Sequence, residues 1–296
     1  MFFLVVLVTL GLLGLIGLMV LLMQLQPGFM GMAHGTEPHH RVHDLTFGFL
    51  LSPAVVGLLA QLRTPSRNVA GQLMALVPWI ALLLAFLLAT TWLVFAPAPV
   101  LAALTLLATI LHPARRDFLR SFNVARVNRV MLALVVIATV PLLAFASTNI
   151  GLQRTLTNDH AALGHYGFMA AFSFTVIGIG LLASVRPPGW RLTAFVAGVL
   201  PALLGLASLL YPDNDSSLGS QWAVAAIAWG VIFVAGASFT GKGARDIAPD
   251  TAAEPVTATA SSTPRWVKAL GIVVLTLAVL FSMLHITGGG PGLHAR

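Results

Sequence analysis

The chain has 296 residues, of which 58% are hydrophobic and only 8% are charged, and its mean hydropathy is +0.93. A soluble chain carries about 25% charged residues, so this composition excludes a soluble fold. The formal net charge of +7 does not indicate a nucleic-acid partner, because the basic residues lie in short loops between apolar stretches rather than on one basic face. There is no cysteine, which excludes disulfides, thiolate metal sites, iron–sulfur clusters and thiol catalysis.

The apolar stretches predict an all-α, polytopic transmembrane bundle, since roughly 20 apolar residues form one membrane-spanning helix. About nine spans follow from this rule. They cover residues 2–24, 44–63, 70–94, 97–112, 130–148, 162–185, 192–211, 220–238 and 267–286. The first lacks a basic leader and a cleavage site, so we expect it to stay as a helix rather than act as a signal peptide. Its Gly11, Gly14 and Gly17 are either ordinary membrane-helix residues or a surface for a close neighbouring helix.

The basic residues of the short loops predict the orientation in the membrane. Lys and Arg gather in the loops after the second, fourth, sixth and eighth spans. The opposite loops hold only Arg41 and Arg154, together with Asp213 and Asp215 after the seventh span. We therefore expect a cell-membrane protein with its N-terminus in the cytoplasm and its C-terminus outside.

A shared offset of 123 residues indicates an internal duplication. The stretch Gly57–Pro65 aligns at this offset with Gly180–Pro188, and each ends in an Arg-x-Pro helix exit. Pro78, inside the third span, aligns with Pro201, inside the seventh. The alternative is a coincidence of composition in a chain rich in Leu and Ala. Because each copy has four spans, the two copies should be parallel, related by a pseudo-twofold axis along the membrane normal.

The predicted organisation is therefore two parallel four-helix repeats plus one C-terminal helix. Residues 1–112 form the first repeat and residues 125–238 the second. Residues 239–264 are rich in Ala, Thr, Ser and Pro, which predicts a flexible cytoplasmic linker. Residues 265–296 provide the ninth helix and a short outer tail.

The histidines give the strongest indication of a functional site. Of the nine histidines, all but His112 are expected on the outer side. Four lead into the second span, two lead into its counterpart, the sixth, and His285 and His294 close the ninth. His39 and His43 are four residues apart and share one helix face, a spacing that can give two ligands to one metal. The predicted cofactor-binding residues are His39, His40, His43, His160 and His165. The predicted metal ligands among them are His39, His43, His160 and His165.

Carboxylates near these histidines in the sequence could orient their rings, namely Glu37, Asp44 and Asp159. On a continuous helix His160 and His165 would diverge, so they are expected to serve different partners. Two alternatives involve no metal at all. The histidines are then either interfacial residues bonded to water and loop carbonyls, or a pH-responsive surface.

One short motif carries a family resemblance. Glu37-Pro38-His39-His40-Arg41 resembles the Glu-x-x-His-Arg pattern at the outer end of the second helix in haem A synthases, which are two fused four-helix bundles. That family pairs its haem ligand with a histidine near the outer end of the fourth helix of each bundle. Here the fourth and eighth spans have none, since His112 lies at the inner end, and the cysteines of some members are absent. Five residues and a helix count do not establish membership.

Three functions remain open from the sequence. The leading hypothesis is an outward-facing, His-rich site for haem or a transition metal, used in redox or cofactor handling. The second is a cofactor-free permease or channel-like protein, and the third is a scaffold that contacts another membrane protein. The middle of the spans holds no Asp, Glu, Lys or Arg, which argues against an ion-coupled transporter. The expected partners are the lipid bilayer and a small molecule or membrane protein.

Overall fold

The computed structural model describes residues 1–25, 41–92, 95–118 and 127–239, which all fall within one compact unit. These residues form helices and turns, with no strand among them. The long helices are α1 (Phe2–Leu25), α2 (Arg41–Gln61), α3 (Val69–Ala89), α4 (Ala98–Ile110), α5 (Arg129–Thr155), α7 (His165–Val185), α8 (Trp190–Leu210) and α9 (Gly219–Phe239). The short ones are η4 (Pro65–Arg67), η5 (Arg115–Asp117) and α6 (Asp159–Ala162).

Seven of these helices are long and apolar enough to cross a membrane, namely α1, α2, α3, α5, α7, α8 and α9. Helix α4 is apolar but shorter, with 13 residues. Eight of the predicted spans thus coincide with helices. The ninth, at 267–286, and nearly all of the predicted linker lie outside the described residues, so the number nine stays a prediction.

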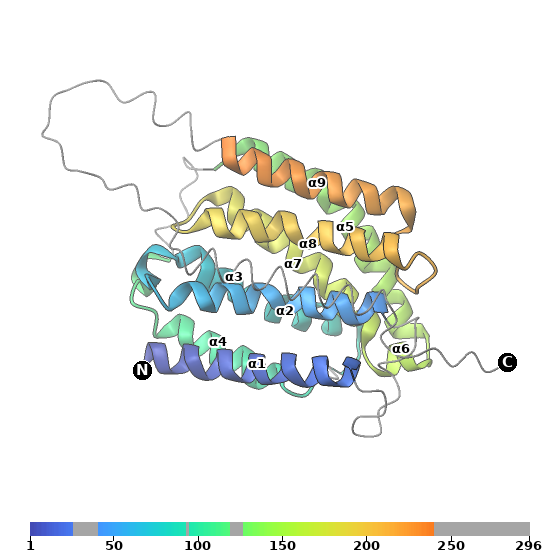
Figure 1. Cartoon of the computed structure of the whole chain (residues 1–296), viewed down its shortest axis with the longest axis horizontal. Helices are drawn as coiled ribbons and strands as arrows, with labels where there is room; N and C mark the ends of the chain where they lie inside the picture. Colours follow the sequence, from blue (N-terminus) through green and yellow to red (C-terminus); the bar gives the residue numbers. More distant parts are fainter. Residues whose placement is uncertain (26–40, 93–94, 119–126, 240–296) are drawn as a thin grey trace, which may run out of the picture. The chain divides into compact units, whose positions relative to one another are not determined.

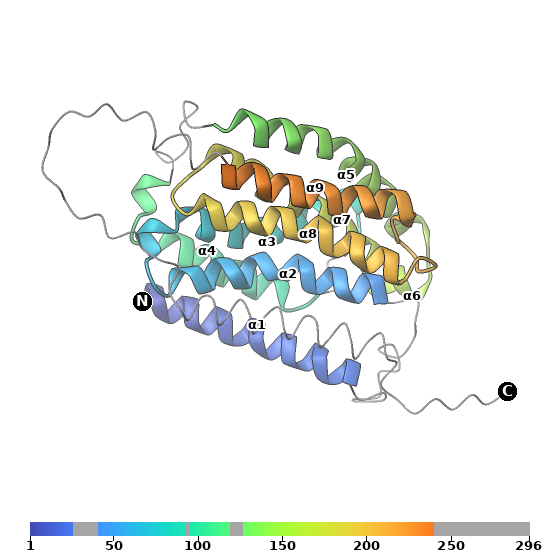
Figure 2. The ribbon, with the colours of Figure 1, turned by 45° about the horizontal axis from the view of Figure 1, so that its top comes forward.

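The eight long helices form four stacked layers of two (Figures 1 and 2). From one side to the other, the layers are α1 with α4, α2 with α3, α7 with α8, and α5 with α9. The central layers are the best buried: 67% of the apolar stretch of α7 is buried, against 17% of that of α5. Helices of both central and outer layers still expose large apolar side chains, such as Leu83 and Leu87 of α3 and Val140 of α5. Such a surface suits lipid better than water.

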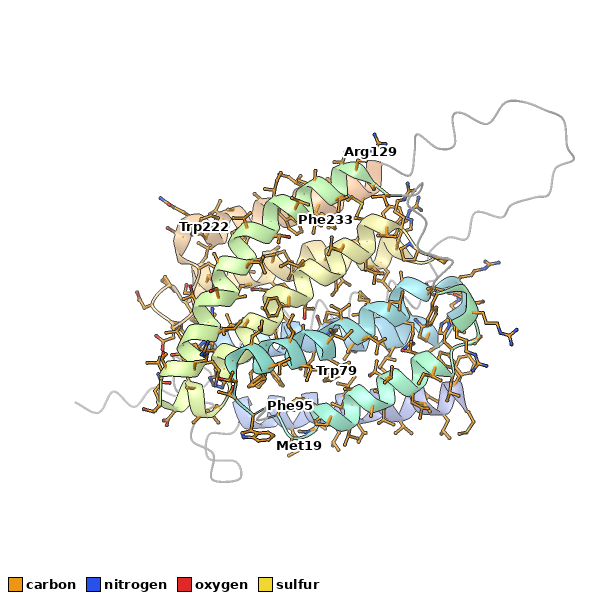
Figure 3. The ribbon with its side chains drawn as sticks, turned by 180° about the vertical axis from the view of Figure 1, so that it is seen from behind. Met19, Trp79, Phe95, Arg129, Trp222 and Phe233 are labelled. Carbon is orange, nitrogen blue, oxygen red and sulfur yellow. The ribbon has the colours of Figure 1, made fainter. Side chains whose placement is uncertain are left out.

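The same pattern of helix contacts occurs twice. In the first four long helices, each contacts the next in sequence and α1 contacts α4. Helices α5, α7, α8 and α9 make the corresponding contacts, and α2 and α3 pack against α7 and α8. Figure 3 shows Arg129 and Trp222 toward opposite ends of this second set. A duplicated four-helix unit would give this arrangement, and the duplication itself stays a prediction.

Glycines allow the closest helix contacts. A Cβ atom added at Gly230 of α9 would lie 2.2 Å from the carbonyl oxygen of Gly198 in α8, so the two backbones touch there. A Cβ added at Gly57 of α2 would lie 2.3 Å from the carbonyl oxygen of Gly71 in α3. One added at Gly14 would meet nothing within 4 Å, so the described residues show no close neighbour for the glycine row of α1.

Candidate metal centre

Three histidines meet at the end of the bundle where α2 and α7 begin, which we call the histidine end. His43 lies in the first turn of α2, His160 in α6, and His165 is the first residue of α7. One potential ligand nitrogen of each lies within 4.8 Å of the others. The Nδ1 atoms of His43 and His160 are only 3.0 Å apart. The His165 ring centre is 5.1 Å from that of His43 and 5.5 Å from that of His160.

A break in the chain brings His160 and His165 together. The Asn158 side chain caps α6 by accepting a hydrogen bond from the Ala161 N–H (3.0 Å). Gly164 then adopts the left-handed conformation, with φ of 75°, which separates α6 from α7. The prediction that the two histidines diverge is therefore wrong, because it assumed one continuous helix. The predicted span at 162–185 corresponds to α7, which begins at His165 for the same reason.

Helix α5 holds both sides of this break through one amide. The Gln153 Nε2 group donates to the carbonyl oxygen of Ala161 (2.7 Å), and its Oε1 atom accepts from the Gly167 N–H (3.0 Å). The side chain thus bonds to α6 and to α7 at once. This requires α5 to extend to Thr155, beyond the end at residue 148 that the apolar stretch predicts.

The loop between α8 and α9 contributes polar groups to the cluster. Ser216 Oγ lies 3.0 Å from His43 Nε2 and donates to Asn149 Oδ1 of α5 (2.8 Å). Asp215 Oδ2 lies 3.8 Å from His160 Nε2 and accepts a hydrogen bond from the Tyr166 hydroxyl (3.2 Å). Two of the three histidines therefore have a polar neighbour on the ring nitrogen that faces away from the cluster, as metal-binding histidines commonly do.

The site is buried on one side and open on the other. His43 is 1% exposed and His160 is 8% exposed, whereas the Asp215 side chain is 54% exposed. Buried polar groups need partners, and the hydrogen bonds of the loop and of α5 supply them. On the side of Asp215 the cluster borders an exposed carboxylate.

The trio has the chemistry of a transition-metal site. Neutral imidazole nitrogens are common ligands of zinc, copper, iron and nickel, with bonds of about 2.0–2.1 Å for zinc. Two such ligand atoms in a tetrahedral site are about 3.3–3.4 Å apart. The longest separation in the trio is 4.8 Å. At least one ring therefore has to turn and bring its nitrogen more than about 1 Å closer for all three to bind one ion.

Of the predicted site residues, the structure brings His43, His160 and His165 together. His39 and His40 lie outside the described residues, as does Glu37. Metal binding by any of these histidines stays a prediction. His112 is at the opposite end of the bundle, where its Nε2 atom lies 3.1 Å from Gln61 Oε1 and its Nδ1 atom accepts from the Ala114 N–H (3.1 Å).

The sequence analysis missed the groups around the histidines. Asn149, Ser216 and Tyr166 were not considered as site residues, and Asp215 was used only for the orientation. Asn149 carried a usable signal, because it directly follows the predicted span at 130–148, and polar residues at apolar spans often have a functional or packing role. Ser216 lies in a polar loop and belongs to no motif.

A separate cavity of about 450 Å³ lies among α5, α7, α8 and α9. Its lining is mostly apolar and aromatic, and includes Phe172, Pro201 and Trp229. The hydroxyls in it come from Thr148 and Ser217, and none of its lining residues in the described part of the chain is charged. The cavity therefore suits an apolar molecule.

No family model matches the sequence, and no match was found among the curated proteins or the solved structures.

Proposed function

We propose that this membrane protein binds one transition-metal ion through His43, His160 and His165. The observation that carries the proposal is the 3.0 Å approach of the His43 and His160 Nδ1 atoms, with a nitrogen of His165 within 4.8 Å. Because the chain has no cysteine, thiolate ligands are excluded. An all-imidazole set suits zinc or copper.

A single ion fits this trio better than haem does. The two axial ligands of a haem iron lie on opposite faces of the porphyrin, roughly 4 Å apart, with the macrocycle between them. The 3.0 Å separation of the His43 and His160 nitrogens leaves no room for a porphyrin between those two rings. We therefore narrow the prediction of haem or a transition metal to a non-haem ion.

A site with three imidazole ligands leaves one coordination position for water or a small molecule. A metal ion there would polarise that molecule or activate bound water. The proposed path from the aqueous phase is the exposed side near Asp215. The loop charges predict that this end lies outside the cell, and we therefore propose an outward-facing site for redox chemistry or cofactor handling.

The test is a titration of the detergent-purified protein with Co²⁺, whose visible spectrum reports its coordination. We expect one equivalent to bind the unchanged protein, and each of H43A, H160A and H165A to bind more than about 100-fold more weakly. The matched control is H112A, which removes an equally buried histidine at the opposite end and should retain binding. Unchanged affinity in the three site variants would refute the proposal.

We also propose the architecture predicted from the sequence, with two duplicated units at 1–112 and 125–238. The shared 123-residue offset and the recurring helix contacts support it. The proposed partners are the bilayer and a small molecule or second membrane protein that reaches the histidine end.

A second candidate function, passage of an apolar solute, is favoured by the cavity of about 450 Å³ that Pro201 lines. In proteoliposomes, L204W should fill the cavity and reduce flux of the solute. L206W should not, because Leu206 is an exposed residue of the same helix and does not line the cavity. Absence of flux with the unchanged protein would eliminate this candidate.

A further inference from the structure

We infer that Asn149 and Ser216 are positioning residues that fix the tautomer of His43, so that His43 binds the metal through Nδ1. The inference rests on the proposed function. It concerns which nitrogen of His43 is the ligand, and how one group from α5 and one from the loop between α8 and α9 select it.

The first step is the orientation of the Asn149 amide. Its Nδ2 group donates to the carbonyl oxygen of Phe145 (2.9 Å). A carbonyl oxygen can only accept hydrogen bonds, so the NH₂ group must face it. The Oδ1 atom, which only accepts, is then the atom that faces Ser216. Asn149 is 1% exposed, so this orientation is enclosed by protein.

The second step is the hydroxyl of Ser216. Because Asn149 Oδ1 only accepts, the single proton of Ser216 Oγ points to it, over 2.8 Å. Toward His43 Nε2, 3.0 Å away, the same oxygen must therefore accept. The proton of a neutral His43 ring then lies on Nε2, and its Nδ1 atom carries the lone pair.

The third step is where that lone pair points. His43 Nδ1 faces His160 Nδ1 at 3.0 Å. The carboxylate of Asp215, 3.8 Å from His160 Nε2, favours a proton on Nε2 of that ring too. A proton shared between these two nitrogens, as in the 3.0 Å hydrogen bond of the metal-free protein, or a metal ion in its place prevents the repulsion of two facing lone pairs. With bonds of about 2.0–2.1 Å, nitrogens at this separation subtend about 90–100° at a metal ion, an ordinary ligand angle.

The backbone conformation of Ser216 supports a role for its side-chain hydroxyl. Its φ of 62° lies in the left-handed region, which residues other than glycine seldom adopt. The neighbouring Ser217 has a different role: its hydroxyl donates to the carbonyl oxygen of Ser208 (3.3 Å) and anchors the loop to α8. Ser217 therefore offers a matched control.

The experiment uses the full-length protein loaded with Cu²⁺ and pulsed electron paramagnetic resonance, which detects the remote nitrogen of each coordinated imidazole. We expect S216G and N149A to weaken Cu²⁺ binding about 10- to 100-fold and to change the remote-nitrogen signal. S217A should leave both unchanged. The S216G variant distinguishes positioning of His43 from a general structural role of Ser216. Glycine adopts the left-handed backbone conformation without strain, so the metal-free S216G protein should unfold at a temperature no lower than that of S217A. Weaker Cu²⁺ binding by S216G is then due to the lost hydroxyl and not to an unstable loop.

Two results would overturn the inference, and they are distinguishable. If the unchanged protein binds Cu²⁺ and S216G and N149A have the same affinity and signal, the positioning role is wrong while the metal site stands. If the unchanged protein binds no Cu²⁺ at the histidines, the proposed function fails and this inference fails with it.

Discussion

At the scale of single residues, two equally buried histidines of this protein have different surroundings. His43 and His112 are each 1% exposed. His112 has a donor on one ring nitrogen, the Ala114 N–H, and an acceptor near the other, Gln61 Oε1. These partners suit one neutral tautomer and give the ring a structural role. His43 instead faces a second imidazole, which is an arrangement typical of metal ligands.

The buried position of His112 leads us to expect a specific dependence of the protein's stability on pH. Burial lowers its pKa from the ordinary 6.5 to about 4, against the opposing effect of a backbone hydrogen bond with Pro65. Below pH 6.5 the unfolded chain takes up a proton that the folded chain does not. Stability from the neutral ring is therefore complete above pH 6.5 and is lost as the pH falls toward 4.

We therefore expect the unfolding free energy of the unchanged protein to fall by about 1 to 3 kcal/mol more than that of H112Q between pH 6.5 and 4. Denaturant titrations in detergent at several pH values measure it. The other histidines titrate in both proteins, so their effects cancel in the difference. Parallel pH curves for the two proteins would contradict the assigned role of His112.

The sequence selected His43, His160 and His165 because histidines are conspicuous next to apolar spans. It could not show that His160 and His165 converge, since this depends on the chain break at Gly164. Ser216 was beyond prediction, because its contact with His43 joins residues 173 positions apart. Such a contact depends on the packing of the bundle, which no local pattern encodes.

At the scale of helices, the close contact of α8 with α9 is the most constrained feature. A methyl group at Gly230 would enter the backbone of α8 at Gly198. We expect G230A to reduce the unfolding free energy by about 1–3 kcal/mol, despite the better helix propensity of alanine. The control G14A adds the same methyl group where no described atom lies within 4 Å, and should be neutral or slightly stabilising. Equal stability of both variants in detergent would show that α8 and α9 do not touch as described.

Helix positions were largely predictable, because the thickness of the membrane core sets the length of an apolar stretch. Helix ends were less so. Helix α5 continues to Thr155 because Gln153 bonds to α6 and α7, and α7 begins late because Gly164 interrupts the chain. Both ends depend on polar tertiary contacts at the histidine end, which the apolar pattern does not report.

At the scale of the whole molecule, the orientation in the membrane is a prediction from loop charges. The chain has no cysteine, so single cysteines can be introduced on a clean background. We expect an impermeant maleimide to label D213C in intact cells and S66C only after the cells are permeabilised. Ser66 and Asp213 are both exposed, in loops at opposite ends of the bundle. The reverse labelling pattern would show that the orientation is inverted and that the histidine end faces the cytoplasm.

The central claim is that one metal ion is held by three imidazoles at the histidine end. X-ray absorption at the metal edge of zinc-loaded protein tests it most directly, because it reports the number, type and distance of the ligands. We predict about three imidazole nitrogens at roughly 2.0–2.1 Å and one further light atom, with the imidazole scattering reduced in H43A. A spectrum with oxygen ligands only, or one that is identical in H43A, would contradict the claim.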